Sequence, residues 1–495
     1  MARIVVIGAG MGGLAAAARL ATVGHRVTVC EAGGSHGGMV GQYERDGFRF
    51  DTGPTLLTLP AVYRDLMLKT GRTRLEDEVE LRPVDPGSLH LLPDGTRVEL
   101  ANASRARVIE ALDAALGAGV GDRWGGLLER GRGVWEATRR PLLEEPLPDD
   151  PSALHRDPYV PARRGLFARA PQTLADVAAR ELRHPGLTAL LDEYALRFGL
   201  DPRHAPASLA SLPYMEQSFG VWYVTGGMRA LADAVLRRCR QRRVELRFDS
   251  RVEQVLGADR VTGVRLADGT RLEADVVVAD TDPRVLGLPA ATRAEPLPGR
   301  FSVLLALRGD RPAGTPHRTV VHAPDRQDEL DALFGPVPRL CARPTVQVLR
   351  PDDATLAPPG HEAALLTVTV PGTALPGTAL PRTAGIRTAG IDWSDPAVTA
   401  AYADAVLAYA APELRDRLLW REPRTPADTE RETGAPGGSV PAPALAGAKG
   451  DYLAAPNRVA ARPGLYLVGG TAHPGGGLAR VGMSAALTAE LIGTP

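Results

Sequence analysis

The sequence predicts an α/β protein in which a Rossmann-type domain is assembled from discontinuous segments and a mixed α+β domain is inserted between them. Three observations lead to this fold class. The first 30 residues predict one strand–helix–strand unit, which is the building block of nucleotide-binding folds. A second strand, glycine loop and helix follow near the other end, at 464–492. The 495 residues are enough for two or three domains.

The charge balance excludes several classes of function. Lys+Arg and Asp+Glu are both 58, so the chain lacks the basic field on which nucleic-acid binders depend. The three cysteines show no CxxC spacing and the ten histidines no HxxxH spacing, so we expect no metal site. No run approaches the roughly 18 apolar residues of a membrane-spanning helix, and no leader precedes Arg3. We therefore expect a cytoplasmic protein that contacts a membrane at most peripherally.

The N-terminal unit is predicted from apolar runs and glycines. Arg3–Ile7 is a short β-branched run, typical of a buried parallel strand. Leu14–Val23, rich in Ala and Leu, predicts a helix, and Gly24 suits the position after its end. His25–Cys30 predicts the second strand, with Glu31 at its end.

The glycines between the first strand and the helix predict phosphate binding. In Gly8-Ala9-Gly10-Met11-Gly12-Gly13, Gly8 permits a tight turn and Gly10 lets the backbone approach a pyrophosphate. Gly13 lets the helix pack closely on the strand, and the helix N-terminus offers unpaired N–H groups to the phosphates. Glu31 stands where a ribose hydroxyl is bound in such folds. An acid at this position favours an unphosphorylated ribose, as in FAD or NAD.

The middle of the chain alternates helical and strand-like segments. Helices are predicted at Pro60–Thr70, Arg105–Gly117, Met228–Arg238 and Asp395–Leu419, and strands at Val244–Phe248, Val261–Leu266, Ala274–Ala279, Ser302–Leu307, Ala363–Val370 and Gly464–Gly469. Asp268-Gly269 predicts a hairpin turn between the second and third of these strands. The repeats of PGTAL and RTAGI at 371–391 predict a low-complexity surface insertion. Gly475–Ile492 predicts a glycine loop that leads into the last helix.

Four longer segments resemble one family. They are GGMVGQYERDGFRFDTGPTLLTLP at Gly37–Pro60, PYMEQSFGVWYVTGG at Pro213–Gly227, the segment Arg343–Val370 with PT and LAPPGHEAALLTVTV, and LYLVGGTAHPGGGLARVGMSAA at Leu465–Ala486. Together they resemble the bacterial phytoene desaturase family of FAD-dependent carotenoid desaturases, within the amine-oxidase-like flavoproteins. The resemblance spans most of the chain.

The resemblance implies FAD as the cofactor and assigns residues to it. Gly53–Thr55 and Gly469–Ser484 would surround the ribityl chain and the isoalloxazine, and the backbone of Val252 would contact adenine. The residues expected to bind FAD are Gly8, Ala9, Gly10, Gly12, Gly13, Leu14, Glu31, Ala32, Gly37, Gly38, Met39, Gly53, Pro54, Thr55, Val252, Gly469, Gly470, Gly477, Val481, Met483 and Ser484.

The sequence departs from the family pattern at several positions. Met39 stands where the family usually has Arg after the paired glycines, which removes a charge near the pyrophosphate. Ala479-Arg480 replaces the usual Pro-Gly near the flavin edge, and the GGTAHPGGG form is similar to that of later-acting carotenoid desaturases and oxygenases.

Three residues are candidates for a catalytic role. His473 is a candidate general base, with a hydrogen-bonded structural histidine as the alternative. Arg480 either points into the substrate channel or pairs with a phosphate, with a structural or surface role as the alternative. Glu216, in the central segment, is expected to face the substrate or to be structural.

The expected division of the chain follows from these segments. The FAD-binding domain would comprise residues 1–60, 206–295 and 426–495, and the substrate domain 61–205 and 296–425, with the insertion 371–391 in its second part.

The resemblance implies desaturation of a long apolar polyene, with oxygen or a quinone as electron acceptor and no nucleic-acid partner. Arg163–Arg169, which mixes arginines with Leu and Phe, is the candidate membrane contact, and a solvated basic loop is the alternative. Alternatives for the function are a polyene isomerase or oxygenase that uses FAD, a flavin amine oxidase, and a non-catalytic prenyl-lipid escort protein.

Overall fold

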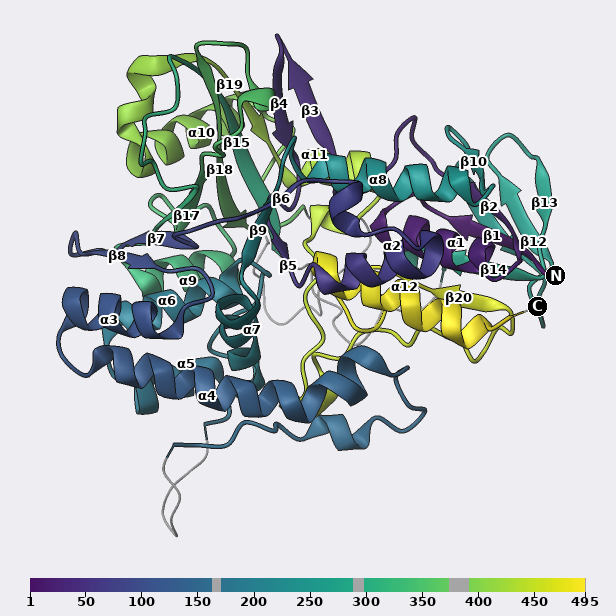
Figure 1. Cartoon of the computed structure of the whole chain (residues 1–495), viewed down its shortest axis with the longest axis horizontal. Coiled ribbons are helices and arrows are strands. Elements are labelled where there is room, and N and C mark those ends of the chain that lie inside the picture. The colour runs from purple at the N-terminus through teal and green to yellow at the C-terminus, as the bar shows by residue number, and fades with distance from the viewer. Residues whose placement is uncertain (163–170, 288–297, 374–390, 495) are drawn as a thin grey trace.

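The computed structural model describes residues 1–162, 171–287, 298–373 and 391–494. Figure 1 shows one sheet beside both chain termini, a larger sheet at the opposite end, and a group of helices from residues 105–219 below the larger sheet. The candidate membrane contact Arg163–Arg169 and nearly all of the insertion 371–391 lie outside the described residues.

The five-stranded sheet is parallel throughout and has the order β10-β2-β1-β14-β20. Its strands are β1 (Arg3–Ile7), β2 (Arg26–Cys30), β10 (Glu245–Arg247), β14 (Val276–Ala279) and β20 (Leu465–Leu467). They come from three parts of the chain that are far apart in sequence, so the predicted α/β fold is confirmed. The boundaries proposed at residues 60, 205, 295 and 425 stay a prediction.

The two faces of this sheet are covered differently. Ile4, Val6 and Val278 face one side, where helices pack against them. These helices are α1 (Met11–Thr22), α2 (Ala61–Gly71), α8 (Met228–Gln241) and α12 (Leu478–Ile492). Val5 and Val277 face the other side, because successive side chains of a strand alternate. There a small antiparallel sheet covers them, with strands β11 (Val252–Leu256), β12 (Gly263–Leu266) and β13 (Arg271–Glu273).

The predicted hairpin turn exists, but it joins different strands. Gly269 lies in the turn with φ +87°, and β12 pairs there with Arg271–Glu273. The run Ala274–Ala279 was expected to be the partner. Instead the chain crosses between the two sheets, and β14 lies parallel to β1. The unbroken apolar run of β14 suits a strand buried on both faces, whereas β13 is short and mostly exposed.

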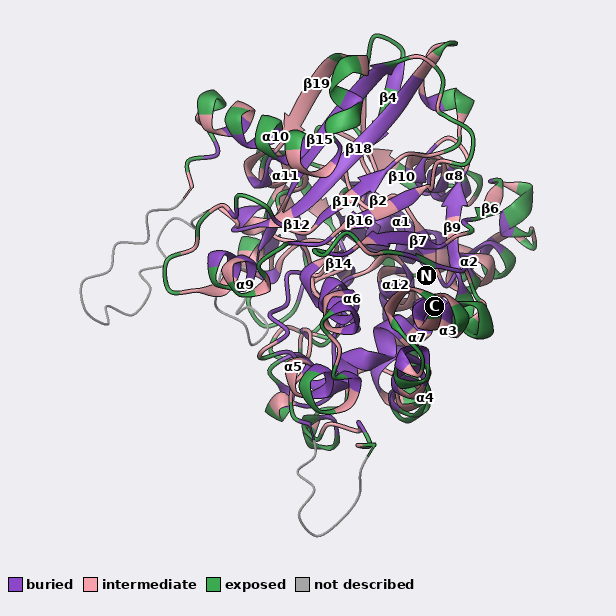
Figure 2. Cartoon of the chain, turned by 90° about the vertical axis from the view of Figure 1, so that its left-hand side faces the viewer, coloured by how far each residue is buried: buried purple, intermediate pink, exposed green. Residues whose placement is uncertain are grey.

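The larger sheet has seven strands in the order β19-β15-β18-β17-β16-β7-β8. Its strands are β7 (Ser88–Leu91), β8 (Arg97–Leu100), β15 (Gly299–Arg308), β16 (Arg318–Val321), β17 (Val346–Leu349), β18 (His361–Val370) and β19 (Leu418–Arg424). Figure 2 shows β15 and β18 as long buried strands of this sheet, with exposed turns on α10 (Pro396–Ala410). The predicted helix Asp395–Leu419 therefore ends earlier than expected, because Leu418 already begins edge strand β19.

The remaining elements connect and cover these sheets. The helices are α3 (Arg105–Leu116), α4 (Val120–Thr138), α5 (Leu174–Val177), α6 (Pro185–Leu196), α7 (Ser211–Phe219), α9 (Arg326–Phe334) and α11 (Pro426–Thr433), and a π-helix, η2 (Arg139–Glu144), extends α4. The other strands are β3 (Gln42–Arg45), β4 (Phe48–Asp51), β5 (Leu57–Thr58), β6 (Leu81–Pro83) and β9 (Val221–Val224). Among the described residues, none of the helices combines the length and the apolar character needed to cross a bilayer.

Candidate functional site

The glycine motifs from the two ends of the chain meet at the start of α1. A Cβ added to Gly12 would lie 2.8 Å from the Cα of Gly469. Gly8 has φ +95°, and a Cβ on Gly13 would overlap the carbonyl oxygen of Gly8. Only glycine fits this turn, so the helix begins close against the strand, as the sequence predicts. The fold thus brings together residues that are separated by more than 450 positions in the printed sequence.

An aspartate that the sequence analysis missed lies on this helix N-terminus. Asp280 follows β14 directly, and its Oδ2 accepts a hydrogen bond of 2.7 Å from the N–H of Gly13. Its carboxylate also borders Gly10 and Gly469, where an added Cβ would overlap it. The carboxyl ends of parallel strands line the ligand crevice in open α/β sheets. That rule, applied to the predicted strand Ala274–Ala279, would have pointed to Asp280.

Burial makes Asp280 a weak acid. Burial raises its pKa, the Gly13 N–H lowers it and the charge of Glu31 raises it, with a net value of about 7. A neutral carboxyl is therefore well populated at neutral pH. The negative charge of the ionised form would compete with a pyrophosphate for the same helix N-terminus.

Glu31 ties together three segments at the end of β2. Its Oε2 accepts from the N–H of Ala9 at 2.7 Å, and its Oε1 from the N–H of Gly33 at 2.8 Å. Its carbonyl oxygen accepts from the N–H of Ser250 at 2.7 Å, which brings the loop before Val252 to the same edge of the sheet. Glu31 is half-buried and Ala32 is exposed, so this edge is open to a ligand.

The paired glycines Gly37 and Gly38 lie against the first glycine loop. Gly37 donates from its N–H to the carbonyl oxygen of Ala9 at 2.8 Å. A Cβ on Gly38 would lie 3.1 Å from the Cα of Gly10. Met39 follows them, and a Cβ on Gly53 would overlap its carbonyl oxygen. The half-buried Pro54 and Thr55 continue along this segment.

Arg229 supplies a cation beside these glycines, although the neighbouring Met39 is uncharged. From the first turn of α8 it donates to the carbonyl oxygen of His36 at 2.7 Å. Its Nη1 would lie 3.5 Å from a Cβ on Gly37. The fold thus places a guanidinium near the glycine loop from a different element, which the sequence pattern around Met39 does not reveal.

Residues 469–484 form the second wall of the candidate site. Ser484 Oγ accepts from the N–H of Gly469 at 3.2 Å and from Nδ2 of Asn457 at 3.1 Å. Gly470 packs against Pro441, and Gly477 begins α12. Val481 and Met483 are half-buried on the same helix, whereas Leu14 on α1 is fully buried in the core and acts through packing.

His473 is held as a neutral, fully buried side chain. Its Nε2 donates to the carbonyl oxygen of Glu145 at 3.1 Å, and its Nδ1 has no partner among the described residues. Burial lowers its pKa to about 4, against the opposing effect of the Glu145 carbonyl. A general base works best with a pKa near the working pH, so this geometry favours a structural role for His473 over that of a general base.

Glu216 lies in a buried ion cluster. It pairs with Arg197 at 2.7 Å and with Arg318 at 2.6 Å. Burial alone would raise its pKa, but the two guanidiniums outweigh burial and lower it to about 2. A carboxylate that is held ionised between two arginines is a poor acid or base, so the structure favours a structural role for Glu216.

Arg480 differs from these paired arginines. It lies in the first turn of α12 and is 7% exposed, and no described carboxylate pairs with it. Its Nη2 lies 3.9 Å from Sδ of Met215, and its Nε has no hydrogen-bond partner. Burial lowers its pKa to about 10, which leaves the guanidinium charged at neutral pH.

The site fits a dinucleotide with an unphosphorylated ribose. The start of α1 is a cradle that any Cβ on Gly8, Gly10, Gly12 or Gly13 would fill, and Glu31 lies at its rim. Within the described residues no cluster of His, Cys, Asp and Glu is arranged to hold a metal ion.

Comparison with known proteins matches this picture. The family model described as flavin containing amine oxidoreductase matches residues 11–378. The hydroxyneurosporene desaturase of Rubrivivax gelatinosus is 31% identical over 99% of this chain and 93% of its own length. The 4,4'-diapolycopene oxygenase of Methylomonas sp is 28% identical over 99% and 98%. Among solved structures, an oxidoreductase from Methanosarcina mazei superimposes with a TM-score of 0.63 at 16% identity, over 99% of this chain and 100% of that one.

Proposed function

The chain belongs to the family of flavin-containing amine oxidoreductases, and from this premise we propose that it is an FAD-dependent enzyme that desaturates a long apolar polyene in carotenoid biosynthesis. The observation that supports this most is the match, over nearly the whole chain, to relatives named as carotenoid desaturases and oxygenases. The substrate loses two hydrogens as one carbon–carbon single bond becomes a double bond. Bound FAD would supply the acceptor for the hydride, a proton would leave the neighbouring carbon, and oxygen or a quinone is the proposed final acceptor.

The residues of this chain have binding and shielding roles. The start of α1 would hold the pyrophosphate, and Glu31 the ribose. The loop 469–477 would surround the ring system, with the N-terminus of α12 directed at the ring oxygens. The large apolar cluster of the helices α3 to α7 would enclose the polyene and exclude water. The neutral His473 and the paired Glu216 fit a reaction in which the flavin, and not an acid–base pair, performs the chemistry.

Two features of the structure weigh against an amine oxidase. Lys69 and Lys449, the only lysines of the chain, are both exposed, so no lysine of this chain lies in the buried site. The unpaired guanidinium of Arg480 would repel a protonated amine in the same region. The glycine cradle also argues against a non-catalytic escort protein, because it is built for a nucleotide.

The test is a turnover assay with purified protein in liposomes. Phytoene, neurosporene or a 1-hydroxylated carotenoid is supplied with oxygen or a quinone. We expect a product that is lighter by two hydrogens and absorbs at longer wavelength. An unchanged mass with a changed isomer pattern would make the protein an isomerase, and a gain of oxygen would make it an oxygenase. Hydrogen peroxide formed only with amines would establish an amine oxidase.

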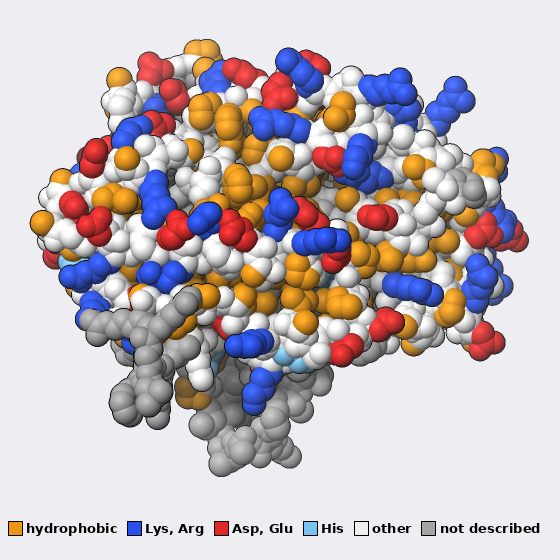
Figure 3. All heavy atoms as spheres, turned by 60° about the horizontal axis from the view of Figure 1, so that its bottom comes forward, with side chains coloured by type: hydrophobic (Ala, Val, Ile, Leu, Met, Phe, Trp, Pro, Cys, Tyr) orange, Lys and Arg blue, Asp and Glu red, His pale blue; other side chains and the backbone are white. Residues whose placement is uncertain are grey.

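We also propose that the bound nucleotide is FAD and that the protein binds membranes peripherally. The purified protein should be yellow, and the nucleotide released by denaturation should co-migrate with FAD. Figure 3 shows one face on which hydrophobic side chains lie between interspersed cationic and anionic ones, as suits shallow contact with a lipid surface. Flotation with anionic liposomes at low salt tests this, and protein that stays at the bottom of the gradient would contradict it.

A further inference from the structure

One buried cation beside the C-terminal glycine loop has no compensating charge. Arg480 is 7% exposed and lies in the first turn of α12, where the helix dipole disfavours a cation. Burial is the one cause that shifts its pKa, so among the described residues no other charged group acts on it. Its Nε has no hydrogen-bond partner, and its Nη2 contacts the weak acceptor Sδ of Met215 at 3.9 Å. Burial of an uncompensated charge is costly, which points to a bound group that carries negative charge.

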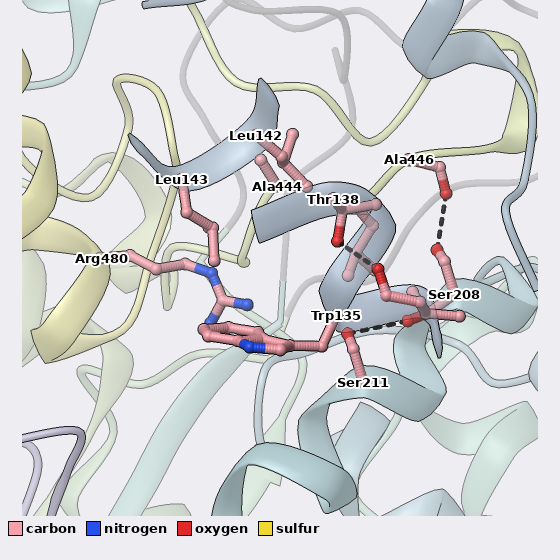
Figure 4. A pocket seen from close by; sticks show the side chains of 11 residues that line it. Trp135, Thr138, Leu142, Leu143, Ser208, Ser211, Ala444, Ala446 and Arg480 are labelled. Atoms are coloured by element: carbon pink, nitrogen blue, oxygen red, sulfur yellow. Dashed lines mark hydrogen bonds between the residues drawn. The ribbon is translucent and has the colours of Figure 1, made fainter. Parts of the chain in front are cut away.

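The small cavity beside Arg480 does not remove this imbalance. Figure 4 shows the side chain reaching from α12 toward Trp135, with Ser208 and Ser211 lining the same cavity. The cavity of about 10 Å³ has room for one water. Both serine hydroxyls donate their protons to backbone carbonyl oxygens. A single water could bridge Arg480 to a serine oxygen, but water and serine are neutral, so the positive charge stays uncompensated.

The guanidinium lies beside the loop that is assigned to the flavin ring. Its Nη1 would lie 3.9 Å from a Cβ on Gly477, the residue at which α12 begins. Cε1 of Phe198 would lie 3.8 Å from the same Cβ. The preceding Arg197 is also a cation, but it is paired with Glu216 at 2.7 Å. Arg480 therefore places an unopposed positive charge at Gly477, whereas the charge of Arg197 is offset.

The proposed reaction creates negative charge in this region. The polyene gives up a hydride from one carbon and a proton from the next. The hydride brings two electrons to the oxidised ring system, whose net charge becomes more negative by one, and the electrons then pass to oxygen or a quinone. A buried cation stabilises such a charge strongly, because little water screens it.

We propose that Arg480 tunes the bound flavin: its uncompensated charge favours the reduced form over the oxidised form and so raises the reduction potential. A charge near the reactive ring is one of the means by which a protein adjusts a flavin. The oxidised ring system is neutral, so the same guanidinium contributes little to holding it. This inference rests on the proposed function, because it requires FAD in the site.

The experiment measures the midpoint potential of the flavin in the holoenzyme, without a polyene, by reduction beside a dye of known potential. Arg480→Met keeps much of the volume but removes the charge. We expect its equilibrium constant for two-electron reduction to fall at least ten-fold, which is a potential lower by at least about 30 mV. Arg480→Lys keeps a cation and should restore most of the potential. Arg132→Met removes an exposed arginine of α4 and should leave the potential unchanged, because solvent and salt screen that charge.

The outcomes separate this inference from the proposed reaction. A potential that falls in Arg480→Met and returns in Arg480→Lys supports it even when no polyene is desaturated. Equal potentials in the wild type and Arg480→Met would overturn it, and so would an equal fall in Arg480→Lys, because shape and not charge would then be the cause. Loss of oxidised FAD from Arg480→Met alone would also overturn it, since the guanidinium would then hold both redox forms. A wild-type protein that binds no flavin would overturn both the cofactor assignment and this inference.

Discussion

The N-termini of α1 and α12 both begin at a glycine and both reach the candidate site, yet they carry opposite charges. At α1, Asp280 accepts from the N–H of Gly13, so a carboxylate already occupies the place that the helix dipole offers to an anion. At α12, the guanidinium of Arg480 lies in the first turn without a carboxylate partner. One helix end must lose or neutralise an anion to bind a phosphate, and the other must gain an acceptor to satisfy a cation.

This difference shows that a helix end is not a fixed anion site. The backbone geometry is similar, but the side chains nearby decide what is bound. Asp280 comes from a neighbouring strand and can be neutralised by a proton, because burial raises its pKa to about 7. Arg480 belongs to the helix itself and stays charged at neutral pH, because its lowered pKa is still about 10.

The largest effect on FAD binding is expected at the α1 end, from Gly13→Ala. The new methyl group would overlap the carbonyl oxygen of Gly8 and press on Asp280, so the helix must move away from the strand. We expect FAD binding to weaken by more than ten-fold, or more than about 1.4 kcal/mol, measured as flavin content after gel filtration. The control is Gly33→Ala, whose Cβ would meet only Glu31 Oε1 at 3.5 Å. Full flavin content in Gly13→Ala would disprove the assigned cradle.

The second effect tests what a paired buried charge contributes. Glu216→Ala leaves Arg197 and Arg318 without their carboxylate partner. Removal of one partner of a buried pair costs about 3–5 kcal/mol, so we expect a large loss of unfolding free energy in urea. Glu136→Ala removes an exposed partner of Arg132 and should cost less than about 1 kcal/mol. Similar losses in the two variants would contradict the buried cluster.

The third effect is pH-dependent and concerns Asp280→Asn. FAD binding brings an anion near Asp280 and so favours its neutral form. Affinity in the wild type should therefore fall as pH rises through about 7, by about ten-fold per pH unit above it. Asparagine keeps the acceptor for the Gly13 N–H and has no charge, so its FAD affinity should stay flat between pH 6 and 8. Titration of apoprotein with FAD at several pH values measures this. The same dependence of affinity on pH in both proteins would refute the competition between the Asp280 carboxylate and the pyrophosphate.

The smallest effect is expected at the α12 end, from the stability of Arg480→Met without ligand. Replacement of an unpaired buried charge by an apolar side chain should raise the unfolding free energy by about 0.5–2 kcal/mol, which is the usual gain from a single stabilising substitution. Thermal unfolding of the apoprotein measures it. A lower Tm than that of the wild type would mean that Arg480 is already satisfied within the fold.

The sequence was sufficient to predict the fold of the N-terminal unit because the signals for it are local. The glycines at 8–13 and the acid at Glu31 have defined spacings, and Gly24 indeed has φ +104° after α1. Asp280 and Arg229 were missed because their roles depend on tertiary placement, at the end of a third strand and on a distant helix. The sequence left two roles open for Glu216 for the same reason: Arg197 and Arg318, which pair with it, come from other elements.

The discontinuous sheet has a consequence for how the protein is made. The edge strand β20 and the helix α12 belong to the last 31 residues of the chain, 465–495, and Gly469 there completes the loop around α1. The segment 465–492 must therefore leave the ribosome before the flavin site can close, and the apolar faces of β14 and α1 stay uncovered until then. We expect nascent chains to depend on chaperones during this interval, and loss of the last 31 residues to leave a protein that cannot retain its flavin.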